Sequence, residues 1–295
     1  MVAVAAVLFG VNGAVSKVIL QRGSGLSPER LTEIRCTGAL LGLAALLLAL
    51  RADGFAVTRR ELARFALLGI GGLALVQWSY FFAIHRIAIG IALLIQYLAP
   101  ILVALVARFV LHEAVRRRIW IALALSLGGL ALIVEIWRGG RLSGAGVAAA
   151  GVAAVTYALY VLLAAREVRT RAPLSAACWA FLFAALFWSV LEPWWTFPAR
   201  RVGADVSLLG NVADTHAPLW ALIAWMVVLG TIVPFALIFG ALRHASATRV
   251  AIVATLEPVV ATLVAYAWLG ESLEPAQLAG AALVLGAIVT AQTAR

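Results

Sequence analysis

The sequence contains very little cysteine: two residues in 295, Cys36 and Cys178. Both lie inside long apolar runs, where an unpaired cysteine behaves as a small hydrophobic side chain. We therefore expect neither a disulfide nor a metal site, and nothing in the sequence calls for a cofactor.

Charged residues are also scarce, at 12% of the chain, whereas hydrophobic residues make up 64% and the mean hydropathy is +1.05. Soluble domains carry about 25% charged residues, and a single soluble core could not bury so much apolar side chain. The alternation in ~10-residue segments that marks a transmembrane β-barrel is absent. The chain is therefore expected to be an all-α membrane protein.

Motifs of intramembrane enzymes are missing as well. The sequence has no HExxH, no aspartate-rich motif, no acidic pair deep in an apolar run and no serine–histidine pair at helical spacing. We therefore expect no enzymatic activity. The formal net charge of +10 would suit a nucleic-acid partner. Most of the 23 Lys and Arg lie in loops or at helix ends, however, as in other membrane proteins, so no nucleic-acid partner is expected.

Ten apolar runs approach the ~20 residues that an α-helix needs to cross ~30 Å of hydrocarbon. We place them at about 2–20, 31–50, 62–84, 88–111, 119–137, 145–165, 174–193, 219–242, 246–269 and 275–293. Loops on the side of the N-terminus hold more of the Lys and Arg than the other loops do. This bias predicts that both termini lie on the inside of the membrane.

Two segments repeat one another: LAPILVALVARFVLHE at 98–113 and LEPVVATLVAYAWLGE at 256–271. Each has a proline near its start and a glutamate at its end, with the same spacing between them. Five runs in each half would turn the second copy upside down. Accordingly, the loop after the first copy contains RRR, and the loop after the second contains no basic residue. The chain is predicted to consist of two five-helix inverted-topology repeats, residues 1–137 and 145–295.

The repeats resemble the two EamA units of the drug/metabolite transporter superfamily over nearly the whole chain. The resemblance rests on the Pro–Glu spacing, on the following helices SLGGLALIV and LVLGAIV, on the openings FGVNGAVSK and TYALYVLLAAR, and on the arginine of LTEIRCTGALL. Two features depart from the family pattern. Phe9 and Tyr157 stand where a tryptophan is usual, and Ala99 replaces the acidic or small polar residue that can precede the first proline.

The resemblance implies a metabolite or drug carrier of the bacterial inner membrane with cytoplasmic termini. Within the superfamily, the chain looks most like the bacterial aromatic amino-acid exporters of the YddG type. It would then export small amphipathic metabolites, aromatic amino acids above all, by alternating access between the repeats. We expect its partners to be a small-molecule substrate and the lipid bilayer, and one chain to function as a monomer.

Carriers for other metabolites, drugs or nucleotide sugars are the alternative. A phosphorylated substrate needs Lys or Arg side chains as direct partners, and only Lys17 and Arg35 are suitably placed. Arg35 lies about a turn and a half into its run, so it is expected to have a buried partner, either Glu33 or a residue of another helix. Lys17 lies near the end of its run, where it either meets a substrate carboxylate or extends to the interface.

Polar and aromatic side chains within the apolar runs are the candidates for a substrate cavity. Polar groups inside bilayer-spanning helices usually point inward, and aromatic rings can stack on an aromatic ligand. Packing between helices is the alternative for each of them. The candidate substrate-binding residues are Asn12, Gln77, Trp78, Tyr80, Phe81, Gln96, Tyr97, Tyr157 and Tyr160.

Glu257 carries the only carboxylate near the middle of its run. An ionisable group at this depth costs at least about 2.5–3.5 kcal/mol, so it should face a cavity or a partner. It is either a substrate-ammonium or proton-coupling site, or a structural acceptor for donors freed by a helix break. The adjacent Pro258, like Pro100 and Pro234, removes a helix hydrogen bond, which makes these prolines candidate hinges or kinks.

Overall fold

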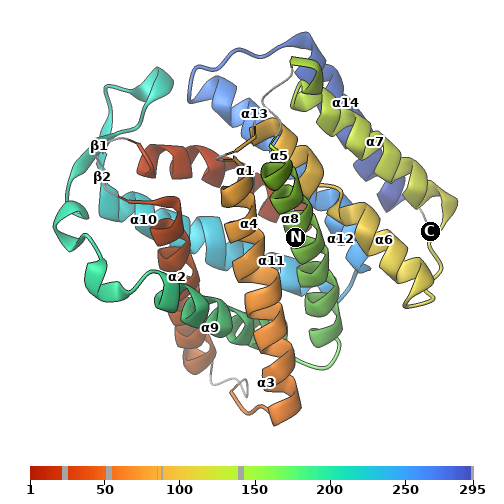
Figure 1. The fold of residues 1–295 in the computed structure, drawn as a ribbon, viewed down its shortest axis with the longest axis horizontal. Helices are drawn as coiled ribbons and strands as arrows, with labels where there is room; N and C mark the ends of the chain where they lie inside the picture. The colour runs from red at the N-terminus through yellow and green to blue at the C-terminus, as the bar shows by residue number, and fades with distance from the viewer. Residues whose placement is uncertain (22–25, 51–54, 85, 88, 139–142, 294–295) are drawn as a thin grey trace.

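The computed structural model describes the chain apart from residues 22–25, 51–54, 85, 88, 139–142 and 294–295. Most of the described chain is helical (Figure 1). Among these residues, nine helical stretches are long and apolar enough to cross a bilayer, and α7, with 17 residues, adds the tenth. The protein is therefore an all-α membrane protein of ten spans, as the hydropathy predicts.

The first repeat contains five spans: α1 (Val2–Ile19); α2 (Pro28–Ala49); α3 (Arg59–Ala66), the π-helical η1 (Leu67–Ala74) and α4 (Leu75–Ile84); α5 (Ile89–Gln96) and α6 (Ala99–Phe109); and α7 (Arg117–Ile133). The second repeat contains α8 (Gly144–Glu167); α9 (Pro173–Leu191); α10 (Leu219–Val227), the π-helical η6 (Val228–Ile232) and α11 (Val233–Leu242); α12 (Ala247–Ala254) and α13 (Leu256–Ala267); and α14 (Pro275–Gln292). Outside the spans lie the strands β1 (Asp205–Ser207) and β2 (His216–Pro218) and the 3₁₀ turns η2 (Ile136–Arg138), η3 (Trp194–Thr196), η4 (Ala199–Arg201) and η5 (Gly210–Val212).

The two repeats share their departures from regular helix. The third and eighth spans each contain a π-helical segment, η1 and η6. The fourth and ninth spans are each interrupted, between α5 and α6 at Tyr97–Leu98 and between α12 and α13 at Thr255. Because these irregularities recur in the same spans of both halves, the repeat extends from the sequence to the backbone.

The ends of the broken spans also match. His112 and Gly270 take positive φ values of 54° and 69°. The next residues, Glu113 and Glu271, donate their backbone N–H to carbonyls of the last helical turn, at 2.8 Å and 3.2 Å. Such closures satisfy carbonyls that a helix end leaves without partners. The glutamates of the repeated Pro–Glu motif therefore begin corresponding loops.

The three prolines lie at these interruptions. Pro100 and Pro258 fall in the first turns of α6 and α13, and Pro234 falls in the first turn of α11, directly after η6. Proline lacks the N–H that would continue the helix ladder, and in a bilayer the freed groups need other partners. At the second break, Thr255 Oγ1 donates to the Ile252 carbonyl at 2.6 Å. Hinge motion at the prolines stays a prediction.

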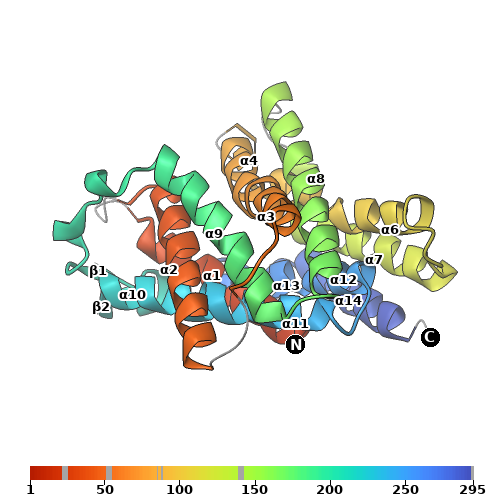
Figure 2. The same ribbon diagram turned by 90° about the horizontal axis from the view of Figure 1, so that it is seen from below.

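Each repeat packs its first helix against the other repeat, in a reciprocal exchange. The first helix of each repeat packs on the third and fourth spans of the other: α1 contacts α11 and α13, and α8 contacts α4, α5 and α6. The second spans, α2 and α9, pair with each other, as do the fifth spans, α7 and α14 (Figure 1). This exchange is the contact pattern of a pseudo-two-fold axis between the repeats. The start of α1 and the end of α14 lie toward the lower edge of Figure 2. Ten spans return the chain to the side of the membrane on which it began, and we name this side the terminal face.

A short antiparallel hairpin, β1–β2, lies on the opposite face with Asp205 paired to Pro218. It is fixed to the ends of two spans. Gln21, just beyond α1, donates its side-chain amide to the Ser207 carbonyl, and Trp268, just beyond α13, donates its indole N–H to the Leu208 carbonyl, both at 2.9 Å. The hairpin therefore covers the ends of α1 and α13 on that face.

Candidate functional site

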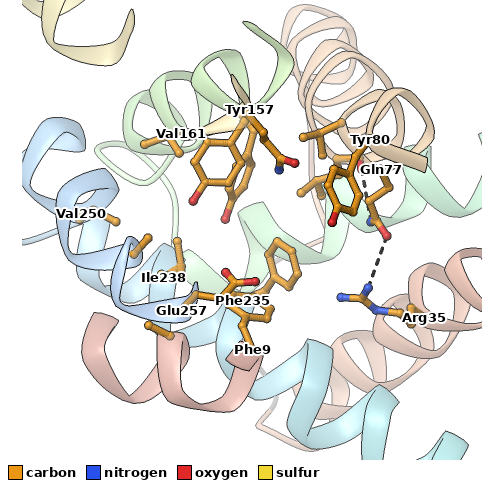
Figure 3. A pocket seen from close by; sticks show the side chains of 16 residues that line it. Phe9, Arg35, Gln77, Tyr80, Tyr157, Val161, Phe235, Ile238, Val250 and Glu257 are labelled. Atoms are coloured by element: carbon orange, nitrogen blue, oxygen red, sulfur yellow. Dashed lines mark hydrogen bonds between the residues drawn. The ribbon is translucent and has the colours of Figure 1, made fainter. Parts of the chain in front are cut away.

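A cavity lies between the two repeats and is lined by helices of both (Figure 3). Helices α1, α2, α4 and α5 come from the first repeat, and α8, α11, α12 and α13 from the second. The cavity has a volume of about 160 Å³. Its position between helices of two structural units is typical of small-molecule sites.

Several sequence-predicted residues come together in the lining. Gln77 and Tyr80 share one face of α4, and Tyr157 and Tyr160 share one face of α8, as three-residue spacing on a helix allows. Gln96 and Glu257 line the same cavity from α5 and α13. Figure 3 shows Gln77, Tyr80, Tyr157 and Glu257 around the cavity. Contact between these side chains and a substrate stays a prediction.

The other candidates lie elsewhere. Asn12 is buried in the packing of α1 against η6, where a Cβ on Gly230 would lie 2.2 Å from Asn12 Oδ1. Trp78 is 44% exposed, packs on Phe82 with ring centroids 5.6 Å apart, and lines a separate surface hollow. The Phe81 side chain lies outside the described residues. The structure therefore separates Asn12 and Trp78 from the cavity lining.

Aromatic rings from three helices form one wall of the cavity. The Phe235 ring of α11 makes edge contacts with Phe9 of α1 at 5.4 Å and with Tyr160 of α8 at 5.9 Å between centroids. Tyr157 continues the wall 5.9 Å from Tyr160. Phe181 supports Phe235 from behind at 5.0 Å. An aromatic or apolar group of a ligand would find flat, fixed surfaces here.

Glu257 presents its carboxylate to this cavity from the first turn of α13 (Figure 3). The break at Thr255 places it one residue from a helix start. The Tyr97 hydroxyl, in the break of the first repeat, lies within hydrogen-bonding reach of the carboxylate. Tyr97 thus contacts the site through Glu257, although it does not itself line the cavity.

Arg35 is the cation of the cavity, and its partners lie on other helices. Its Nε donates to Thr231 Oγ1 at 3.1 Å, and its Nη1 donates to Gln77 Oε1 at 3.5 Å (Figure 3). Glu33, the alternative partner considered from the sequence, instead pairs with Arg30 at the start of α2. The second alternative, a partner on another helix, is therefore the one that the structure contains.

Sequence reasoning missed part of this lining. Phe9 and Phe235 gave no signal as site residues, because a phenylalanine in an apolar run faces lipid as readily as a cavity. Arg35 does stand out in the sequence, because ionisable residues inside spans usually mark functional sites. Within the described ranges, no three His, Cys, Asp or Glu side chains gather as metal ligands.

Comparison with known proteins gives the chain a family. The model of the EamA-like transporter family matches residues 1–135 and 144–291. The chain is also similar to a solved structure described only as a crystal structure of a protein. That structure has a TM-score of 0.73 and 19% identity, over 98% of this chain and 99% of the other. This likeness supports the fold alone.

Curated relatives point the same way. The chain is 26% identical to the uncharacterised transporter YwfM of Bacillus subtilis, over 100% of this chain and 93% of the relative. It is 27% identical to an uncharacterised transporter of Pseudomonas aeruginosa, over 83% and 77%, and 27% identical to one of Archaeoglobus fulgidus, over 72% and 70%. The family model covers both halves of this multi-pass membrane protein, and the chain therefore belongs to the EamA-like transporter family.

Proposed function

We propose that this transporter exports small amphipathic metabolites, with aromatic amino acids as its preferred substrates. The observation that carries the proposal is the aromatic wall of Phe9, Tyr157, Tyr160 and Phe235 in a cavity between the repeats. Edge or stacked contacts with such a wall are worth about 0.5–1.5 kcal/mol for each ring pair beyond burial. The basic loops of the terminal face support a cytoplasmic position for both termini in the bacterial inner membrane.

The test is flux of labelled tryptophan into liposomes that contain the purified protein. We expect protein-dependent flux that phenylalanine and tyrosine compete and that nucleotide sugars do not. An applied pH gradient distinguishes proton exchange, in which the gradient changes the rate, from uniport. Liposomes that show no protein-dependent tryptophan flux, with or without the gradient, would contradict the proposed substrate.

Alternating access requires contacts between the repeats that form and break at each face. Two ion pairs of this kind occupy corresponding places. On the face opposite the termini, Lys17 at the end of α1 pairs with Glu271 after α13, at 2.7 Å. On the terminal face, Arg169 after α8 pairs with Glu113 after α6, at 3.1 Å. Exposed ion pairs contribute only about 0–1 kcal/mol, so we infer that they act as weak, reversible latches.

Reversing one latch should therefore slow transport modestly. Glu271→Lys places two like charges together, and we expect the transport rate to change by about two- to five-fold, the factor that corresponds to 0.4–1 kcal/mol. The double exchange Lys17→Glu with Glu271→Lys restores the attraction and should return the rate toward that of the wild type. Equal rates for the single and double variants, measured in liposomes, would show that this pair does not act as a latch.

A further inference from the structure

The cavity holds two opposite charges that are not paired with each other. Arg35 approaches from α2 of the first repeat, and Glu257 approaches from α13 of the second. Figure 3 shows their charged groups on different sides of the cavity. Among the described residues, neither has an ion-pair partner within 4.0 Å. The charged atoms of Arg35 and Glu257 are therefore more than 4.0 Å apart, and both residues face the space of one cavity.

Each charge retains unused bonding capacity toward that space. The two hydrogen bonds of Arg35 go to neutral oxygens, and the one to Gln77 is long, at 3.5 Å. A guanidinium has five N–H donors in a planar fork that suits a carboxylate. At Glu257, the Tyr97 hydroxyl can occupy only one of about four acceptor positions on the carboxylate.

A third group points to a ligand independently of the two charges. Gln96 also lines the cavity, and its Oε1 is buried without a hydrogen-bond partner among the described residues. An unmade hydrogen bond to a buried acceptor costs about 1–3 kcal/mol. A bound donor such as an ammonium group would satisfy this oxygen.

We propose that Arg35 and Glu257 form a dipolar site that binds the carboxylate and the ammonium of a zwitterionic substrate, an inference that rests on the transport function proposed above. The substrate carboxylate accepts hydrogen bonds from the Arg35 fork, and the ammonium donates to Glu257 and to Gln96. The side chain of the substrate then lies against the aromatic wall. Because the two charges belong to different repeats, one bound zwitterion bridges the interface that moves during transport.

The proposed site should bind ligands that lack one of the two charges more weakly than it binds a zwitterion. A charge-assisted hydrogen bond contributes enough to change affinity by about 10- to 100-fold. Isothermal titration of the purified protein should therefore show tryptophan binding about 10- to 100-fold more tightly than tryptamine, which lacks the carboxylate. A similar preference is expected over indole-3-propionate, which lacks the ammonium. These ligand comparisons use the wild-type protein, so they do not depend on any variant folding.

Variants of Arg35 test whether this residue binds the carboxylate of the substrate. Arg35→Gln should lower tryptophan affinity by about 10- to 100-fold and tryptamine affinity far less, because tryptamine has no carboxylate to lose. Arg35→Lys keeps the charge without the planar fork. Its affinity for tryptophan should therefore lie between those of the wild type and of Arg35→Gln. The matched control is Arg108→Gln, an exposed arginine at the end of α6 that does not line the cavity.

The outcomes separate this inference from the proposed substrate. If leucine binds, tryptophan does not, and Arg35→Gln lowers leucine affinity, the aromatic preference fails and the dipolar site stands. If the three indole ligands bind the wild type within about three-fold of one another, the dipolar site is overturned. It is also overturned if Arg35→Gln lowers tryptophan and tryptamine affinity equally, or if none of the four ligands binds.

Discussion

The substitution Glu257→Gln is expected to reduce the rate of tryptophan transport by at least about 100-fold while leaving the protein folded. Glutamine keeps the size of the side chain and an acceptor oxygen for Tyr97, but it removes the negative charge. In the proposed complex, Glu257 is paired with the substrate ammonium. Removing one partner of such a buried charge pair typically costs about 3–5 kcal/mol, which corresponds to more than 100-fold in affinity. Initial rates of labelled tryptophan flux in liposomes measure the effect.

The same variant distinguishes two roles for this carboxylate. If Glu257 serves only as a hydrogen-bond acceptor at the broken helix, Glu257→Gln retains that function and transport stays near the wild-type rate. Glu257→Asp supplies the matched comparison, because it keeps the charge and withdraws it by one methylene group. A charge role predicts more transport by the aspartate variant than by the glutamine variant. If wild-type flux responds to a pH gradient and Glu257 carries the proton, the residual flux of Glu257→Gln should not respond.

The second large effect concerns the contact between α7 and α14. The substitution Gly129→Val should lower the melting temperature of the purified protein by about 2–12 °C. A Cβ at Gly129 would lie 2.6 Å from the Gly280 carbonyl oxygen, and a Cβ at Gly280 would lie 2.5 Å from the Gly129 oxygen. Overpacking costs about 1–3 kcal/mol or more, at roughly 2–4 °C per kcal/mol for a chain of this size.

Two other glycines of the same helices, Gly128 of α7 and Gly286 of α14, provide controls. A Cβ at Gly128 or at Gly286 meets nothing within 4 Å, so valine there carries the intrinsic cost of a β-branched residue without the clash. Gly280→Val should reproduce the loss caused by Gly129→Val, and Gly286→Val should not. Equal melting temperatures for the Gly128→Val and Gly129→Val variants would contradict the close approach of these two helices.

Much of the fold follows from the sequence because the bilayer imposes a length and a composition on every span. The ten apolar runs all correspond to helices, and the Pro–Glu spacing predicts the repeat whose backbone irregularities also match. The boundaries of the spans differ from the prediction by a few residues. The fifth span is predicted at 119–137, whereas α7 begins at Arg117 and ends at Ile133. It begins earlier because the arginine side chains of its first turn can extend to the interface.

The π-helical segments could not be predicted from hydropathy. A π-helical turn adds a residue and rotates the face that later residues present. This change affects Gln77, Trp78 and Tyr80, which follow η1 on α4. Gln77 and Tyr80 line the cavity, whereas the neighbouring Trp78 is exposed. Periodicity alone places these residues on a helix, but the packing of that helix on α8 decides which of them face the cavity.

Site residues were predictable in proportion to their polarity. A tyrosine, glutamine or glutamate inside an apolar run stands out, and Tyr80, Gln96 and Glu257 meet in the cavity. Asn12 stands out equally, yet it packs against Gly230, because a polar group in a bilayer can be placed by helix contact as well as by a cavity. Phe9 and Phe235 became candidates only when their helices were brought together in three dimensions.

Protection of a cavity position by substrate is the most direct test that the cavity between the repeats is the substrate site. Ala254→Cys would place a thiol in the lining, in a background of Cys36→Ala and Cys178→Ala that removes both native thiols. The rate of its alkylation is measured in liposomes with increasing tryptophan. We expect tryptophan to slow alkylation, with half-maximal protection at the concentration that half-saturates transport. Alkylation that is unchanged at tryptophan concentrations that saturate transport would place the substrate site elsewhere.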